Sequence, residues 1–379
     1  MPRAKTLMVS TCGTSLLTGL TRPGKPHADR AQPIAGSANA TAKSATVAQR
    51  EAINTVAVDC RGILKGDSTE TVRQASAELN GLLGFYDNQL DHAQGDLHVL
   101  LHSDTLQGET VAEILREYLA RKHVNASVQS FSDLRTDTLV NFQSGLAGVI
   151  RWCQDTLPAY RASQYRIVFN LTGGFKSIQG WMQTLGMFYA DEIIYIFESG
   201  GELLRIPRIP VDIGSAALEA IRQHLPLFRR LGAGSRTCRS AEVPNGVPEA
   251  FFYQVGDDVE LSPWGQVVWQ QAREKLYSEK LLDSPTETIV FTEHFKRAAR
   301  NCTPGQLAHV NERIDDFAAY LADQGKNLGR LNVRPLRGNP VPPSTHEFNA
   351  WAKHPAWRVF FHSDGDGNKI LDDLKPGIH

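Results

Sequence analysis

The chain has 379 residues, of which 41% are hydrophobic and 21% charged, and this length and composition predict a globular protein of two or three domains. The net charge is −1, so the overall charge predicts no polyanion partner. Its longest apolar runs are too short to cross a membrane, and the N-terminus lacks a secretory signal. Five cysteines without a CxxC pair argue against a disulfide framework or a zinc site, so we expect a cytoplasmic protein.

Short apolar runs alternate with helical patterns in the first part of the chain. The expected strands are TLMVS, DLHVLLH, SVQSF, RIVFNL, EIIYIF and LLRIP. Such alternation predicts a parallel sheet flanked by helices, a Rossmann-like α/β domain, which we place at residues 1–235. Residues 21–45 are rich in Gly, Pro, Ala and Ser and are predicted to form a mobile loop or insertion.

A stretch rich in glycine, proline and serine follows Arg230 and is predicted to be a domain boundary. Beyond it, Ser262 is expected to cap a helix that has Pro263 at its first position. The apolar residues of this helix that fall on one face are Trp264, Val267, Val268, Ala272 and Leu276. The small size of this segment favours a helix-turn-helix or winged-helix connector at residues 236–284.

The remaining segment, residues 285–379, starts with the expected strand TETIVFT and continues with two helical patterns. The second pattern begins with a capping box formed by Thr303 and Gln306, with Pro304 at the first helical position, and is expected to end at Gly325. Three strand-like runs follow, namely HEFNAWA, WRVFFHS and NKILDDL. This order predicts a small α+β domain with an antiparallel sheet.

Three expected strands of the first domain end in polar or glycine-containing loops, STCGTS, HSDTLQGE and NLTGGFKS. Ligands of parallel α/β sheets bind at the carboxyl ends of the strands, where such loops converge. The loops match neither the dinucleotide pattern nor the P-loop spacing. Backbone N–H groups near Gly13, Gly173 and Gly174, together with Lys176, nevertheless suit phosphates. The alternative is that these glycines only permit tight turns, and Cys12, which has no neighbouring histidine in its loop, is interpreted as a packing residue.

These three loops resemble those of the CARF family, the CRISPR-associated Rossmann-fold sensors, over about the first 230 residues. The resemblance implies a homodimer whose paired loops bind a cyclic oligoadenylate made by a type III CRISPR complex, with cyclic tetra-adenylate as the expected ring. By position, the implied activator contacts are Thr11, Cys12, Gly13, Thr14, Ser15, Asp104, Thr105, Gln107, Thr172, Gly173, Gly174, Phe175 and Lys176. Some CARF domains also cleave their ligand, and Thr11 with Lys176 would be the pair for that ring nuclease activity. The helix from Ser262 resembles the winged-helix connector often found after CARF domains.

Basic and aromatic residues cluster near the C-terminus. Six basic residues and one acidic residue, Glu347, lie between positions 326 and 358, which predicts an RNA-binding surface in an otherwise neutral chain. The basic residues are Lys326, Arg330, Arg334, Arg337, Lys353 and Arg358. Phe348, Trp351 and Trp357 are expected either to stack on bases or, most of all for Trp357, to pack in the core. Carboxylates with metal-site spacing are missing from this segment, so metal-free RNA cleavage is the predicted chemistry, with Arg, Lys and His as base, acid and charge stabiliser.

The runs RPLRGNP, WRVFF and KPGIH resemble elements of the RelE family of ribosome-dependent mRNA interferases, over roughly residues 286–379. The resemblance implies that Arg358 stabilises charge at the scissile phosphate and that Arg337 contacts the backbone of mRNA or ribosomal RNA. The further implied residues are Arg334 and Lys353 as phosphate ligands, and His379 as general acid or base, with Lys375 or His354 as substitutes.

Taken together, these features predict a cyclic oligoadenylate-activated endoribonuclease without metal or cofactor. It would cleave mRNA in the ribosomal A site and arrest translation and growth in antiviral defence. One alternative is a ligand-responsive transcription regulator whose winged helix binds DNA, although the mixed charges of QAREKLYSEK disfavour a recognition helix. Another alternative is a CARF protein with a metal-dependent or ribosome-independent nuclease.

Overall fold

The computed structural model describes residues 5–66, 68–196, 201–209, 213–232, 237–322, 329–338, 340–351 and 356–377. Contacts between residues divide the chain into two compact units, Met1–Asp212 and Ile213–His379. The domain boundaries expected at residues 235 and 284 stay predictions.

A six-stranded sheet forms the centre of the first unit, in the order β3-β2-β1-β4-β5-β6. Neighbouring strands are parallel from β3 to β5, and only β6, at one edge, runs antiparallel. The strands are β1 (Thr6–Thr11), β2 (Leu97–His102), β3 (Asn125–Ser130), β4 (Arg166–Asn170), β5 (Glu192–Ile196) and β6 (Leu203–Pro207). All six coincide with the expected apolar runs, and their order is the doubly wound Rossmann order. The predicted Rossmann-like α/β fold is confirmed.

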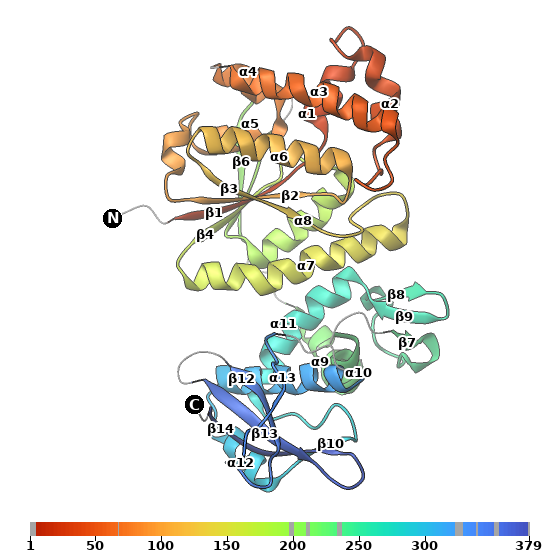
Figure 1. Ribbon diagram of the computed structural model, residues 1–379, viewed down its shortest axis with the longest axis vertical. Helices are drawn as coiled ribbons and strands as arrows, with labels where there is room; N and C mark the ends of the chain where they lie inside the picture. Colours follow the sequence, from red (N-terminus) through yellow and green to blue (C-terminus); the bar gives the residue numbers. More distant parts are fainter. Residues whose placement is uncertain are drawn as a thin grey trace. The chain divides into compact units, whose positions relative to one another are not determined.

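Helices cover both faces of this sheet, with α3, α5 and α6 on one side and α7 and α8 on the other (Figure 1). The helices are α1 (Ser15–Thr18), α2 (Ala31–Gly36), α3 (Val47–Lys65), α4 (Thr69–Ala75), α5 (Ala77–Phe85), α6 (Leu106–Arg121), α7 (Leu139–Ala162) and α8 (Lys176–Tyr189). The sequence of α6 explains its place. Thr105 caps its N-terminus by accepting a hydrogen bond from the Gly108 N–H, and Val111, Leu115 and Leu119, four residues apart, are fully buried.

The segment at residues 21–45, expected to be a mobile loop or insertion, contains a 3-10 turn at Ala28–Arg30 and the helix α2. Ile34 and Ser37 are buried, and the side-chain amide of Gln107 donates hydrogen bonds to the Ile34 carbonyl (2.5 Å) and the Ser37 hydroxyl (2.7 Å). The insertion is therefore packed against the start of α6. Of the two alternatives, this packing favours the insertion, since Ile34 and Ala45 are buried.

The second unit begins with three helices and a small antiparallel sheet in the order β7-β9-β8. These elements are α9 (Ser215–Gln223), α10 (Leu225–Gly232), β7 (Cys238–Arg239), β8 (Phe252–Val255), β9 (Asp258–Leu261) and α11 (Pro263–Glu279). The predicted cap is confirmed, since the Ser262 hydroxyl accepts from the Gly265 N–H at 3.0 Å and Pro263 opens the helix. Phe228 of α10 stacks on Trp269 of α11 in the core between them.

A five-stranded sheet in the order β10-β14-β13-β12-β11 follows. Its elements are β10 (Ile289–Phe291), α12 (Glu293–Arg300), α13 (Pro304–Ala322), β11 (Arg334–Pro335), β12 (His346–Trp351), β13 (Trp357–Ser363) and β14 (Lys369–Pro376). The predicted α+β element order and the Thr303–Gln306 capping box are confirmed. The sheet departs from the expectation in two respects, because β10 pairs with β14 in parallel and because the short strand β11 adds to the three strands expected after the helices. The predicted helix end at Gly325 lies outside the described residues.

A buried polar network connects α10, α11 and α13. Arg229 of α10 forms a 2.6 Å ion pair with Asp315 of α13, and the Tyr277 hydroxyl of α11 donates to the same carboxylate. Asn311 of α13 donates 2.9 Å hydrogen bonds to the carbonyl oxygens of Tyr277 and Lys280. Since buried polar groups are costly without partners, these bonds hold the three helices in one arrangement.

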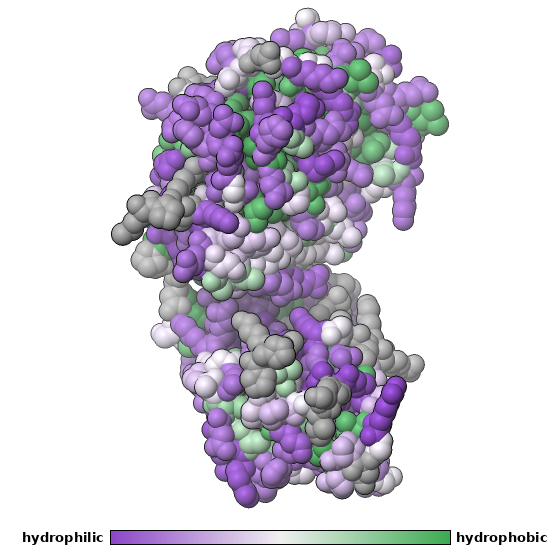
Figure 2. All heavy atoms as spheres, turned by 60° about the vertical axis from the view of Figure 1, so that its left-hand side comes forward, coloured by the Kyte–Doolittle hydropathy of each residue, from purple (hydrophilic) through white to green (hydrophobic). Residues whose placement is uncertain are grey.

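The molecular surface seen in Figure 2 is mainly hydrophilic, with apolar side chains scattered over it. Across the described part of the chain, no helix is both long enough and apolar enough to cross a membrane.

Candidate functional site

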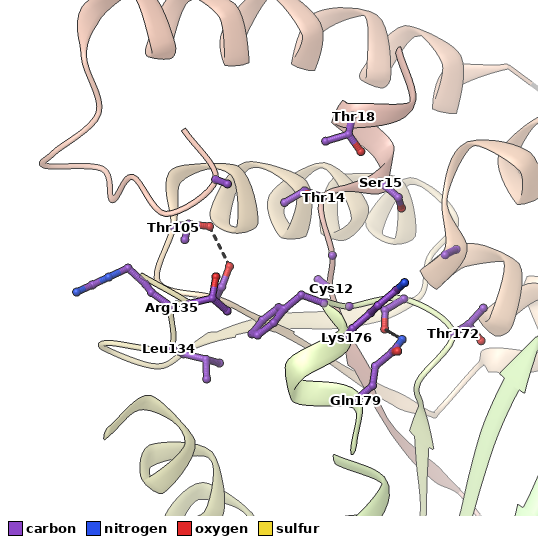
Figure 3. A pocket seen from close by; sticks show the side chains of 18 of the residues that line it. Cys12, Thr14, Ser15, Thr18, Thr105, Leu134, Arg135, Thr172, Lys176 and Gln179 are labelled. Atoms are coloured by element: carbon purple, nitrogen blue, oxygen red, sulfur yellow. Dashed lines mark hydrogen bonds between the residues drawn. The ribbon is translucent and has the colours of Figure 1, made fainter. Parts of the chain in front are cut away.

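The first candidate site lies where the strand order of the first unit reverses. β1 has β2 on one side and β4 on the other, so the connections leave the sheet in opposite directions and open a crevice at their carboxyl ends. A pocket of about 420 Å³ occupies this crevice (Figure 3). The predicted activator residues that line it are Cys12, Gly13, Thr14, Ser15, Thr105, Thr172, Gly173, Gly174, Phe175 and Lys176.

Three predicted activator residues do not line the pocket, because their side chains have other partners. The buried Thr11 hydroxyl donates to the Gly173 carbonyl at 2.6 Å. Asp104 forms a 2.8 Å ion pair with Arg135. Gln107 is buried against the insertion described above. The geometry thus gives Thr11 and Gln107 structural roles.

Cys12 lines the pocket but is almost fully buried. Burial, with a smaller contribution from the charge of Glu78, raises the pKa of its thiol well above the usual range. A thiol in this state is a poor nucleophile, which supports the interpretation of Cys12 as a packing residue.

Sequence reasoning missed Arg135 and Gln179, which also line the pocket. In Figure 3, Arg135 lies on one side of the pocket and Thr172 on the other. The amide of Gln179 donates to the carbonyl oxygens of Leu171 (3.2 Å) and Gly173 (3.3 Å), so it holds the loop after β4. Arg135 follows β3, and applying the strand-end rule to that fourth loop would have found it.

One of the backbone N–H groups expected to bind phosphate, that of Gly13, is already occupied. Glu78, a buried residue of α5, accepts a 2.8 Å hydrogen bond from the Gly13 N–H and a 2.7 Å bond from the Ser76 hydroxyl, and the nearby Gly174 N–H lowers its pKa. Burial raises the pKa of Glu78, although these hydrogen bonds act in the opposite direction. A Cβ atom at Gly173 would lie 2.2 Å from the carboxylate oxygen, so Gly173 allows close packing on Glu78. The expectation that the loop amides face a phosphate is therefore corrected for Gly13 and stays a prediction for the other amides.

The second candidate site lies on the five-stranded sheet of the second unit. Val359 and Phe361 of β13 pack into the core with α13, so strand alternation places Arg358, Phe360 and His362 on the opposite face. The register puts Arg358 opposite Lys375 of β14.

The guanidinium group of Arg358 has hydrogen-bond donors that lack an acceptor among the described residues. Its Nε and Nη1 atoms are buried and have no hydrogen-bond partner among the described residues. Burial lowers the pKa of Arg358, and the charge of Arg334 lowers it further. Buried donors without partners are rare in proteins, and a guanidinium of this kind suits an incoming phosphate.

Other predicted basic residues on this face are neutralised. Arg334 forms a 2.6 Å ion pair with the buried Glu347, and Lys375 forms a 3.0 Å ion pair with Asp373. Arg337 is exposed after β11. Lys353, His379, His354 and Lys326 lie outside the described residues. The predicted basic surface therefore carries less net charge than the sequence indicated, because the strand register brings in acidic partners.

Arg330, counted in the predicted basic cluster, is paired as well. Two of its nitrogen atoms donate to the Asp316 carboxylate of α13, at 3.0 and 2.7 Å. The charge of Arg330 is therefore neutralised by Asp316 within the second unit.

The structure also tests whether the aromatic residues Phe348 and Trp357 are exposed for stacking on bases or packed in the core. Phe348 is fully buried and stacks on Phe317 with ring centres 4.7 Å apart, so the expectation that it stacks on bases is wrong. Trp351 and Trp357 stack on each other at 5.1 Å and pack against the core. The core interpretation of Trp357 is confirmed.

His362 was missed as a candidate acid or base. Its Nδ1 lies 2.9 Å from the Asp372 carboxylate, which also accepts a 2.6 Å hydrogen bond from the Ser344 hydroxyl. Its position four residues after Arg358 on an alternating strand was the signal that sequence reasoning overlooked. Within the described ranges, no three His, Cys, Asp or Glu side chains gather as metal ligands.

A doubly wound α/β unit with a polar pocket at its switch point belongs to the broad class of Rossmann-like ligand-binding domains. Residues 73–209 match the family described as CRISPR-associated protein (Cas_APE2256). A solved structure of Can2 from Sulfobacillus thermosulfidooxidans in complex with cyclic tetra-adenylate is similar over 90% of this chain and 76% of that chain, with 8% sequence identity and a TM-score of 0.23.

Proposed function

We propose that this chain is a CRISPR accessory effector whose first unit binds a cyclic oligoadenylate. The family match over residues 73–209 supports the CRISPR context. The pocket supports the ligand class, since it combines the cation Lys176 with the hydroxyls of Thr14 and Ser15, whereas Arg135 in its lining is paired with Asp104. These groups suit the phosphates and ribose hydroxyls of a ribonucleotide ring.

The activator proposed first is cyclic tetra-adenylate, bound between two copies of the chain. A pocket of about 420 Å³ is at the small end of the range for ligand sites and holds only part of a four-nucleotide ring. An apolar rim for a second copy is present beside it. Leu139 and Val140, at the start of α7, are 69% and 55% exposed, and Phe142 of the same helix contacts the pocket residue Phe175. A homodimer that covers this rim would complete the site and bury these side chains.

We propose further that residues 236–284 form a winged-helix connector and that the C-terminal sheet is a RelE-type endoribonuclease. The RelE-type part of the proposal rests on Arg358, which lies on the sheet face opposite the core helices. Its buried Nε and Nη1 atoms have no hydrogen-bond partner among the described residues. Arg358 would stabilise the charge that develops on phosphorus when the 2′-oxygen attacks. Lys375 lies opposite Arg358, and His362 lies further along the strand, as candidates for proton transfer.

The substrate in this proposal is mRNA in the ribosomal A site. RelE-type catalysis relies on the ribosome to order the message, so free RNA is expected to be a poor substrate. Activator binding in the first unit would switch on cleavage by the second, and the result would be arrest of translation and growth in the cytoplasm during antiviral defence.

In vitro translation with each cyclic oligoadenylate, followed by mapping of mRNA cleavage sites, tests this function. We expect cleavage within translated codons only when the matching activator and ribosomes are both present, and we expect it to persist in EDTA. Intact ribosome-bound mRNA at every ring size would overturn the proposal. Equal cleavage of free RNA, or loss of cleavage in EDTA, would instead favour a ribosome-independent or metal-dependent nuclease.

A further inference from the structure

Glu78 is the buried acid of the first unit that lies closest to the pocket lining. It does not line the pocket itself, but the backbones of Gly13, Gly173 and Gly174 separate it from the pocket by a single layer. Its hydrogen-bond partners are the N–H group of the lining residue Gly13 and the Ser76 hydroxyl, and the N–H group of Gly174 favours its charged form. Among the described residues, the structure gives Glu78 no ion pair with a lysine or an arginine.

This arrangement affects an anion in the pocket in two ways. First, a buried charge that only neutral donors compensate repels a nearby anion more strongly than a solvated charge does, because the surrounding dielectric constant is low. Second, the N–H groups of Gly13 and Gly174 form an anion-binding concavity, and Glu78 fills it from behind. Both effects weaken binding of a phosphate beside Gly13 and Gly174.

We propose that Glu78 is an internal anion that occupies the anion-binding amides of the two activator loops and thereby limits the affinity of the pocket for its polyanionic activator. The inference rests on the proposed function, since it takes the activator to be a cyclic oligoadenylate. Glu78 acts through the two loops and is a positioning residue. The lowered affinity sets a threshold concentration, because the activator must accumulate to a higher concentration before the site fills.

The decisive variant is Glu78→Gln in the full-length chain. The glutamine oxygen can keep the bond from Gly13, and its amide group can donate to Ser76, so the loops should stay in place while the negative charge is removed. Cyclic tetra-adenylate should bind this variant about tenfold more tightly than the wild type, as expected for removal of one nearby charge. A merely structural role would predict equal or weaker binding.

Two control variants separate charge from geometry. Glu78→Asp keeps the charge on a shorter side chain and should bind no more tightly than the wild type. Thr11→Val removes the bond to Gly173 without changing the charge, and it should weaken binding. Melting curves without ligand identify any variant that fails to fold.

The outcomes distinguish this inference from the proposed function. Tighter binding by Glu78→Gln alone supports the inference. If the wild type binds cyclic tetra-adenylate but Glu78→Gln binds equally or less tightly while remaining folded, the inference is wrong and the proposed function stands. If neither binds any cyclic oligoadenylate, both are wrong.

Discussion

The hydroxyl group of Thr11, at the end of β1, donates a 2.6 Å hydrogen bond to the carbonyl oxygen of Gly173, 162 residues further along the chain. A Cβ atom at Gly174 would lie 2.8 Å from the same hydroxyl oxygen, and one at Gly13 would lie 3.0 Å from the Gly174 nitrogen. The loops after β1 and β4 are therefore packed backbone against backbone, which holds the pocket wall in place before a ligand arrives.

Gly173→Ala should disrupt this wall. The new Cβ atom would overlap the buried carboxylate of Glu78, which has little room to move. We expect a loss of about 1–3 kcal/mol in the free energy of unfolding and a loss of activator binding. The matched control is Gly180→Ala in α8, where nothing lies within 4 Å and where alanine should stabilise the helix by about 0.5–1 kcal/mol. Urea denaturation of both variants checks this, and equal changes in stability would contradict it.

Arg358→Ala should abolish cleavage while leaving the fold intact. Loss of a charge stabiliser lowers the rate of such reactions by about 10²–10³-fold. The unfolding free energy should change little, because the buried Nε and Nη1 atoms have no hydrogen bond to lose among the described residues. Arg300→Ala, which removes an exposed arginine of α12, is the control and should cleave at the wild-type rate. Arg358→Lys should not restore activity, since an ammonium group lacks the planar pair of donors. Full activity in Arg358→Ala would remove it from the mechanism.

Arg229→Met should destabilise the second unit by about 3–5 kcal/mol, because it leaves the buried Asp315 carboxylate without its cation. The double variant Arg229→Met/Asp315→Leu should recover most of that loss, since no unpaired charge remains. A double-mutant cycle measured by chemical denaturation gives the coupling directly. Additive losses would show that the ion pair does not act as a unit.

The stability of the first unit should depend on pH through His98. Burial lowers the pKa of His98 from 6.5 to about 4. The unfolded chain therefore binds a proton that the folded chain does not between these values, so stability is full above pH 6.5 and falls by about 3 kcal/mol as the pH drops to about 4. His98→Gln should lose this slope. A pH series of unfolding free energies checks it, and identical slopes in variant and wild type would exclude His98 as the cause.

The sheet of the first unit was predictable because its strands have a strong local signal. TLMVS is apolar enough to be buried on both faces, and Leu7, Met8 and Val9 are completely inaccessible. The strand-end rule then placed the pocket loops correctly. Glu78 was not predictable, because it belongs to a helical segment about 65 residues from Gly13 and about 96 from Gly174, and a lone glutamate gives no sign that it accepts their N–H groups.

The basic surface of the second unit shows a different limit. Counting charges along the chain treats Arg334 and Lys375 as available, but the strand register pairs Arg334 with Glu347, and Lys375 reaches Asp373 two residues before it. Arg358 alone of these three keeps buried donors without partners, and that distinction depends on which neighbours the register supplies.

Asn311 has a consequence for how this protein can be rebuilt. Its side chain bonds the carbonyl oxygens of Tyr277 and Lys280 and the Leu282 N–H, all on the connector side of residue 284. A chimera cut at residue 284 would strip every one of these partners from a fully buried amide. Recombination can therefore exchange this C-terminal segment between proteins only together with the helices before it, and the inherited module is the whole of residues 213–379.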